Sequence, residues 1–456
     1  MQKLLFPRWL ARGLFIALGL TLVVGLILLP TQVTYSSDPY AVVRTFTNPG
    51  GSGADSFGAS VAWVGSKALI GAPGYNPGGA DESGAAYVYD DVLNQSAVPV
   101  VLSKSVPITR EELGFAVADF GGQALVGVPG HKEAGIVAGA AYVFDVVTGQ
   151  VVLTMTNPSP DPDPFVREGF GSAVAEVNGN VVVGAPGVNA PGSPSAGEAY
   201  RMNGATGALS DTLYNPTPTF ISPESFGSAV AAYGDDVLIS APLDVAGGGS
   251  SDYGAVYLID PDTLTIMRTF TNPTPVALDY FGASIAVSGT HVLIGAPDDN
   301  SAGASKAGAA YLFDGNTGTL LHTFYLTSTT TPGISPASDD NFGTAVSLNG
   351  QHILIGAPGR DSGATNAGAA YLFNATTYSF IQVLANPFAE ADDAFGASLA
   401  VNTDLFLVGA PKVGVGTTTT GEVYLFSFAP PTPTPVAQLY LPVIRREVAP
   451  TPTPGF

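Results

Sequence analysis

Short apolar runs recur along the chain, and turn-forming residues separate them. Each run is roughly four to eight residues long, is rich in β-branched and aromatic residues, and is bounded by Gly, Pro or Asn. Some runs are near-copies of one another, as in residues 43–49 and 267–273, or 69–73 and 354–358. This pattern is typical of β-strands joined by tight turns, and it predicts an all-β chain.

The runs belong to a repeat whose clearest element is a Phe-Gly block, Phe-Gly-small-small-Val-Ala. A Gly-Ala-Pro-type run and then a Gly-Ala-Ala-Tyr-type run follow each Phe-Gly block, and a further apolar run precedes each block. Each repeat therefore holds four predicted strands. The blocks start at Phe57, Phe170, Phe226, Phe281, Phe342 and Phe395, with a weaker copy at Leu113-Gly114-Phe115.

Seven repeats of four strands predict a seven-bladed β-propeller, in which four-stranded antiparallel sheets surround a central channel. The small residues of the Phe-Gly block favour the innermost position for that strand, where the blades crowd together. The chain starts with a strand at 42–48 that has no earlier blade, and it ends with a third strand at 423–426 that has no fourth. We therefore expect the N-terminal strand to complete the last blade, which removes exposed sheet edges.

These motifs resemble the FG-GAP repeat, the blade unit of the integrin α-subunit propeller and of many bacterial surface proteins. The motif's name is spelled out in Phe281-Gly282 and Gly295-Ala296-Pro297, and the resemblance covers residues 41 to about 428. It implies a β-propeller and, by analogy, adhesion or ligand binding.

The resemblance does not carry over the calcium sites of integrin blades. Those blades hold spaced aspartates between the first and second strands, whereas this chain has tight turns such as Asn178-Gly179 and Asn349-Gly350. Two central residues cannot supply the six to eight oxygen ligands that calcium takes. We expect no cofactor, while calcium binding elsewhere stays open.

Acidic residues are the remaining candidates for chemistry. An acid, in most copies two residues upstream, precedes each Phe-Gly block or its equivalent. A ring of carboxylates could attract cations, but recurrence in all blades favours a structural role, with each acid accepting backbone N–H bonds in its own turn. Asp298 and Asp299 are weak metal candidates in a loop that is otherwise typical of solvated turns. The repeated acids are Asp55, Glu112, Glu168, Glu224, Asp279, Asp340 and Asp393.

The two ends of the chain differ from the repeats. Residues 1–36 carry basic residues followed by an apolar run at 13–29, which predicts a signal peptide or an uncleaved N-terminal membrane anchor. Residues 37–429 would form the propeller, and residues 430–456 a Pro/Thr-rich tail with one short apolar run. Either N-terminal alternative exports the propeller, so we expect a secreted or cell-surface protein.

The composition excludes several classes of binding partner and of chemistry. A net charge of −21 disfavours nucleic acid and anionic lipid surfaces, and the absence of cysteine excludes disulfides and thiolate chemistry. No paired-histidine metal spacing or Gly-x-Ser-x-Gly elbow occurs, so we expect no enzymatic activity. We expect a monomer.

The lengths of the connections distinguish the two faces of the predicted propeller. Turns from first to second and from third to fourth strands are short, while the other connections, such as 74–83 and 327–341, are long. Long loops on a rigid scaffold commonly carry binding functions. The leading hypothesis is a non-catalytic extracellular binding or adhesion propeller that presents its long-loop face to a protein or glycan. The alternatives are a structural spacer protein without a specific ligand and, ranked last, an enzymatic propeller.

Overall fold

The computed structural model describes residues 39–428 with short gaps. The N-terminal segment and the Pro/Thr-rich tail predicted above lie outside the described residues. The gaps are residue 52 and residues 78–80, 164–165, 190–194, 219–222, 246–251, 329–330, 332–333 and 416–417.

Seven four-stranded antiparallel sheets form the described chain, and we number these blades in chain order. Blade 1 holds β2 (Ser60–Val64), β3 (Lys67–Ala72), β4 (Ala85–Tyr89) and β5 (Val100–Leu102). Blade 2 holds β6 (Val117–Phe120), β7 (Gln123–Val128), β10 (Ala140–Phe144) and β11 (Val151–Thr156). Blade 3 holds β12 (Ala173–Val177), β13 (Asn180–Ala185), β14 (Glu198–Met202) and β15 (Leu209–Tyr214).

Blade 4 holds β16 (Val230–Tyr233), β17 (Asp236–Ala241), β18 (Ala255–Asp260) and β19 (Thr265–Thr271). Blade 5 holds β20 (Ser284–Ser288), β21 (His291–Ala296), β22 (Ala309–Asp314) and β23 (Leu320–Phe324). Blade 6 holds β24 (Val346–Leu348), β25 (His352–Ala357), β26 (Ala369–Asn374) and β27 (Phe380–Ala385). Blade 7 holds β28 (Ser398–Asn402), β29 (Leu405–Ala410), β32 (Glu422–Phe428) and β1 (Tyr40–Thr47).

Two small hairpins lie outside the blades, in connections between second and third strands. They are β8 (Lys132–Glu133) with β9 (Ile136–Val137), and β30 (Gly414–Val415) with β31 (Thr418–Thr419).

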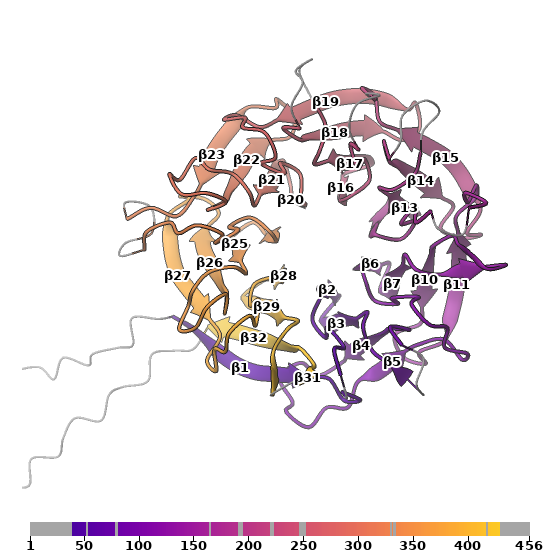
Figure 1. The fold of residues 1–456 in the computed structure, drawn as a ribbon, viewed down its shortest axis with the longest axis horizontal. Coiled ribbons are helices and arrows are strands. Elements are labelled where there is room, and N and C mark those ends of the chain that lie inside the picture. The colour runs from indigo at the N-terminus through magenta and orange to yellow at the C-terminus, as the bar shows by residue number, and fades with distance from the viewer. Residues whose placement is uncertain are drawn as a thin grey trace, which may run out of the picture. The chain divides into compact units, whose positions relative to one another are not determined.

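The seven blades surround a common axis, as Figure 1 shows. The first strand of every blade lies innermost, and these strands contact one another around the ring. The predicted seven-bladed all-β architecture is therefore confirmed, including the placement of the strand with small residues at the axis.

The N-terminal strand closes the ring. β1 pairs antiparallel with β32, and Thr45 lies opposite Tyr424 in the register. In Figure 1 the indigo β1 runs beside the yellow β32. This confirms the prediction that the first strand completes the last blade.

The hydrophobic core lies between adjacent blades and is built from their second and third strands. One cluster, for example, joins Leu125 and Val143 of blade 2 to Val181 and Val183 of blade 3. In blades 1 and 3–7, the phenylalanine of the Phe-Gly block packs on the tyrosine of that blade's third strand, as Phe281 does on Tyr311 at 5.8 Å between ring centroids.

Two glycines explain why the Phe-Gly and Gly-Ala-Pro motifs occur together. A Cβ added to Gly356 of blade 6 would lie 2.0 Å from the carbonyl oxygen of Gly396 in the next Phe-Gly block. Gly396 itself has a φ of +91°, a conformation that side chains rarely adopt. The motif glycines are therefore required where neighbouring blades touch.

One connection departs from the predicted division between short and long loops. Residues 90–99 of blade 1 join third and fourth strands and form a long loop on the face of short turns. Arg44 of β1 donates hydrogen bonds to the carbonyl oxygens of Asp91 and Ala97 in this loop, at 2.8 and 3.3 Å. The extra length is used to hold the closing strand.

Candidate functional site

The acids that precede the Phe-Gly blocks are buried, and one of them is a different residue from the one predicted. In each blade the backbone oxygen of the acid accepts a hydrogen bond from the residue after the Gly-Ala-Pro-type motif. In blade 2 this acceptor is Glu111, bonded by Gly130 N at 3.0 Å, and the Glu111 side chain is buried. The repeated acids are therefore Asp55, Glu111, Glu168, Glu224, Asp279, Asp340 and Asp393.

The assignment of Glu112 to this set was wrong, because Glu111 and not Glu112 lies two residues before Leu113, which takes the place of the phenylalanine. Leu113 is buried, and Phe115 two residues later is exposed, so the block starts at Leu113. Glu112 is the next residue along the chain, and its side chain instead forms an ion pair with Arg167 of the following connection.

An asparagine holds the buried acid in five blades. In blade 5, Asn272 Nδ2 donates to Asp279 Oδ2 at 2.8 Å, and Val276 N donates to the same oxygen at 2.6 Å. The sequence reasoning missed these partners, although each is followed by proline and the Asn-Pro pair recurs along the chain. The asparagines are Asn48, Asn157, Asn215, Asn272 and Asn386.

In blade 2, basic side chains replace the asparagine. Glu111 Oε1 lies 2.7 Å from both Lys104 Nζ and His131 Nδ1. Burial alone would raise the pKa of Glu111, but the bonds to His131 and Lys104 outweigh it, and the pKa is lowered.

Blade 6 also uses a basic residue. Arg360 Nη1 lies 2.9 Å from Asp340 Oδ2, while Ala337 N donates to the same oxygen at 2.7 Å. Burial raises the pKa of Asp340 and outweighs the bonds from Ala337 and Arg360, which lower it.

Blades 4 and 5 each add a second buried carboxylate, Asp244 and Asp299. Asp299 receives hydrogen bonds from Ser301 N at 2.6 Å and from the Tyr311 hydroxyl at 2.5 Å, one on each oxygen. Burial raises the pKa of Asp279 to about 7, and the neighbouring charge of Asp299 adds to this effect. These acids form local hydrogen-bond networks that connect each blade to the end of the preceding blade's outer strand, where Asn215 and Asn272 lie.

The two weak metal candidates point to different partners. Asp298 Oδ2 lies 2.9 Å from Lys306 Nζ, and Asp298 Oδ1 accepts a hydrogen bond from Asn341 at 3.0 Å, whereas Asp299 is bonded as described. Among the described residues, no three histidine or acidic side chains are grouped so that they could hold a metal ion.

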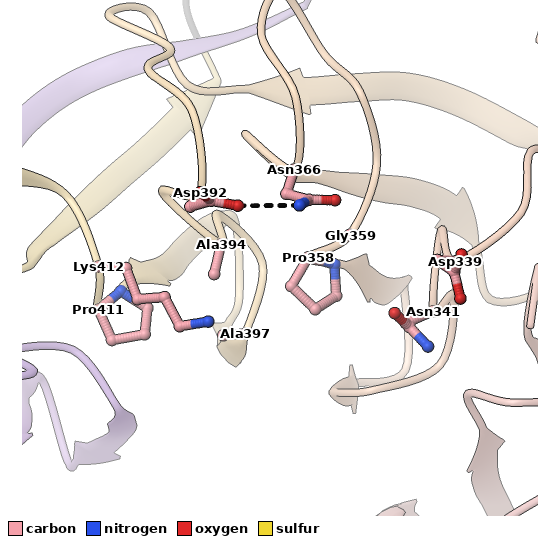
Figure 2. Close-up of a pocket in the computed structure, with 10 residues that line it drawn as sticks. All are labelled: Asp339, Asn341, Pro358, Gly359, Asn366, Asp392, Ala394, Ala397, Pro411 and Lys412. Atoms are coloured by element: carbon pink, nitrogen blue, oxygen red, sulfur yellow. Dashed lines mark hydrogen bonds between the residues drawn. The ribbon is translucent and has the colours of Figure 1, made fainter.

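Pockets between neighbouring blades lie on the long-loop face. The pocket between blades 6 and 7 has a volume of about 360 Å³. Figure 2 shows Lys412 on one side of it and Asp339 with Asn341 on the other, and a hydrogen bond of 2.8 Å from Asn366 to Asp392. Three of the long connections and the loop after β29 supply these side chains, so the pocket depends on the contact between blades.

A pocket at the equivalent position lies between blades 1 and 2 and has a volume of about 510 Å³. Glu82 takes the place of Asn366, and Phe115 takes the place of Ala397. This second pocket extends to Arg167 and Ser172 at the start of blade 3. Its lining residues are Ala54, Ser56, Pro73, Gly74, Glu82, Glu112, Phe115, Pro129, Arg167 and Ser172.

The backbone at the rim of these pockets has the left-handed conformation. The residue just before each Phe-Gly block has positive φ in all seven blades, and it is glycine only in blade 3. Values of +53° at Ser56 and Asn341 and +60° at Glu112 direct these residues into the rim of the pockets described above. The seven residues are Ser56, Glu112, Gly169, Ser225, Tyr280, Asn341 and Ala394.

Within the part of the chain that the structure describes, no helix is long and apolar enough to cross a membrane.

Comparison with known proteins identifies the repeat. The family described as FG-GAP repeat matches residues 41–89, 270–313 and 336–373, which lie in blades 7 and 1, in blades 4 and 5, and in blade 6 with the connection before it. No match was found among curated proteins. The chain therefore carries FG-GAP repeats in three regions and folds as a seven-bladed β-propeller, consistent with the propellers of integrin α-subunits.

Proposed function

We propose that this chain is a non-catalytic propeller that acts outside the cell and binds a protein or glycan through its long-loop face. The observation that carries this proposal is the pair of equivalent pockets between blades 1 and 2 and between blades 6 and 7. Each is lined by side chains from several connections, and pockets on a rigid scaffold commonly bind ligands.

The absence of catalysis is part of the proposal. The buried acids Asp279, Asp340 and Asp393 are bonded to asparagine, arginine or backbone groups of the same blade or of the connection that leads into it, which supports a structural use. Export rests on the N-terminal apolar run at 13–29, which favours a secreted or surface-anchored protein.

A binding panel tests this function. The full chain, purified in a detergent without a sugar headgroup, is probed against immobilised extracellular-matrix proteins and glycans. We expect saturable binding to at least one of them. The double variant Asp339→Ala/Lys412→Ala, on the rim of the pocket between blades 6 and 7, or changes in the pocket between blades 1 and 2, should weaken it.

The matched control is Asp235→Ala/Lys67→Ala, which removes the same two charges from the short-turn face. Asp235 lies in the turn before β17, and Lys67 is the first residue of β3, where it pairs with Asp90. Equal loss with this control would indicate nonspecific electrostatics. If no probe binds, the spacer alternative replaces the binding proposal.

A further inference from the structure

One side chain in the pocket between blades 1 and 2 breaks the sevenfold repeat. Phe115 directly follows the glycine of its Phe-Gly-type block, at a position where the other six blades carry Ala, Ser or Thr. Its side chain is 45% exposed. The fold therefore does not need a large residue at this position, because six equivalent positions pack without one. The small residues are Ala59, Ser172, Ser228, Ala283, Thr344 and Ala397.

Three charged side chains, Glu82, Glu112 and Arg167, line the pocket together with Phe115, and each belongs to an ion pair. Glu112 forms an ion pair with Arg167, and Glu82 lies 3.7 Å from Arg110 Nε. Each carboxylate thus has a guanidinium partner, although the chain as a whole carries a net charge of −21. Counted with Arg110, which pairs with Glu82 from outside the lining, the charges at the pocket cancel, and the pocket offers both donors and acceptors beside an aromatic residue.

We propose that this pocket is a subsite for a neutral sugar residue, with Phe115 as the stacking platform; the proposal rests on the binding function proposed above. A sugar ring presents an apolar face of C–H groups that can pack on an aromatic face, and hydroxyls around its edge. The guanidinium of Arg167 and the carboxylates of Glu112 and Glu82 match such hydroxyls as donors and acceptors. A volume of about 510 Å³ accommodates one or two sugar rings.

The same geometry disfavours charged guests. A basic peptide side chain would approach Arg167 and Arg110, and the acids it would need are already paired. An anionic glycan would approach an acidic protein at a pocket where no cation is unpaired. The pocket between blades 6 and 7, with Ala397 at the position of Phe115, lacks the aromatic surface.

The experiment compares two phenylalanines on the same face. Phe115→Ala installs a residue that three other blades carry at this position, so the variant should melt like the parent. Phe388→Ala removes another exposed phenylalanine, 75% exposed, which lines neither pocket. Full-length proteins in a detergent without a sugar headgroup are titrated calorimetrically with dextran, mannan, and β-1,4-linked glucose and N-acetylglucosamine oligosaccharides, with heparin as the anionic probe.

We expect one neutral saccharide to bind, with affinity reduced at least tenfold in Phe115→Ala and unchanged in Phe388→Ala. Binding that survives Phe115→Ala, a preference for heparin, or no binding of any neutral saccharide would overturn the subsite. If the matrix-protein arm of the panel still shows binding that the changes in the pocket between blades 6 and 7 weaken, the proposed function stands without the sugar. If neither arm binds, both proposals fail.

Discussion

Tyr40 and Gln382 exchange two hydrogen bonds across the closure of the ring. Tyr40 N donates to Gln382 Oε1 at 3.0 Å, and Gln382 Nε2 donates to the Tyr40 carbonyl oxygen at 2.8 Å. Gln382 lies on β27 of blade 6, so the closing strand β1 is held by a neighbouring blade as well as by β32. Because Arg44 is also hydrogen-bonded to the loop of blade 1, β1 is bonded to both neighbouring blades, 6 and 1.

Replacing Gln382 with alanine should therefore loosen the closure. The change leaves the buried N–H and C=O groups of Tyr40 without these partners, and each such loss costs about 1–3 kcal/mol of unfolding free energy. Chemical denaturation should show a destabilised protein, with Gln150→Ala as the control because Gln150 is exposed. Equal stability of the two variants would show that the side chain contributes nothing to closure.

The register of the closing strands can be tested with a cysteine pair, because the chain has no native cysteine. Ala41 lies opposite Ser427, so Ala41→Cys/Ser427→Cys should form a disulfide under mild oxidation. The mismatched pair Ala41→Cys/Glu422→Cys should not, since Glu422 lies opposite Thr47. Non-reducing electrophoresis distinguishes the two, and cross-linking of the mismatched pair alone would contradict the register.

A methyl group on Gly356 should destabilise the contact between blades 6 and 7. The added Cβ would lie 2.0 Å from the Gly396 carbonyl oxygen, so the backbones must separate, at a cost of about 1–3 kcal/mol or more. Gly350→Ala is the matched control, because nothing lies within 4 Å of the added carbon. Thermal melts of the two variants provide the comparison, and a Gly356→Ala protein as stable as its control would show that the blades can shift freely.

The sequence was sufficient to predict the propeller because the signals for strands and glycines are local and are repeated in every blade. The closing strand was also predictable, since the phase of the repeats leaves one strand unpaired at each end. The hydrogen-bond partners of the buried acids were harder to predict from the sequence, because they depend on which loops lie next to one another in the folded protein. Glu111 was missed because two acids, Glu111 and Glu112, stand side by side before Leu113, and the sequence does not show which of them is buried. The function of the Asn-Pro pairs became visible only when Asn272 was seen next to Asp279.

The loop of residues 90–99, which binds Arg44, is another contact that the sequence alone could not predict. The length of this loop is visible in the sequence, but its use is not, because Arg44 reaches it from a strand that belongs to the opposite end of the ring. The pockets likewise combine side chains from different connections, and the pocket between blades 1 and 2 reaches a third blade. Of their lining residues, Phe115 departs from the repeat in the sequence, but the sequence does not show that it lines a pocket.

The buried acids predict that the protein is more stable at mildly acidic pH than above neutrality. The pKa of Asp279 is raised to about 7 in the folded protein, whereas an unfolded aspartate titrates at about 4. Between these values the folded state binds more protons than the unfolded state, so the stability contributed by Asp279 is fully present below pH of about 4 and is lost as the pH rises to about 7. Burial also raises the pKa of Glu168, Asp244, Asp340 and Asp393, which act in the same direction.

Asp279→Asn isolates this effect. An asparagine oxygen can accept the bonds from Asn272 and Val276, but it does not titrate, so the fall in melting temperature between pH 5 and pH 8 should be shallower in the variant by a few degrees. Asp235→Asn, at an exposed position, should follow the parent curve. Parallel curves for Asp279→Asn and the parent would show that Asp279 is already ionised at pH 5, and that the network around it tolerates the charge.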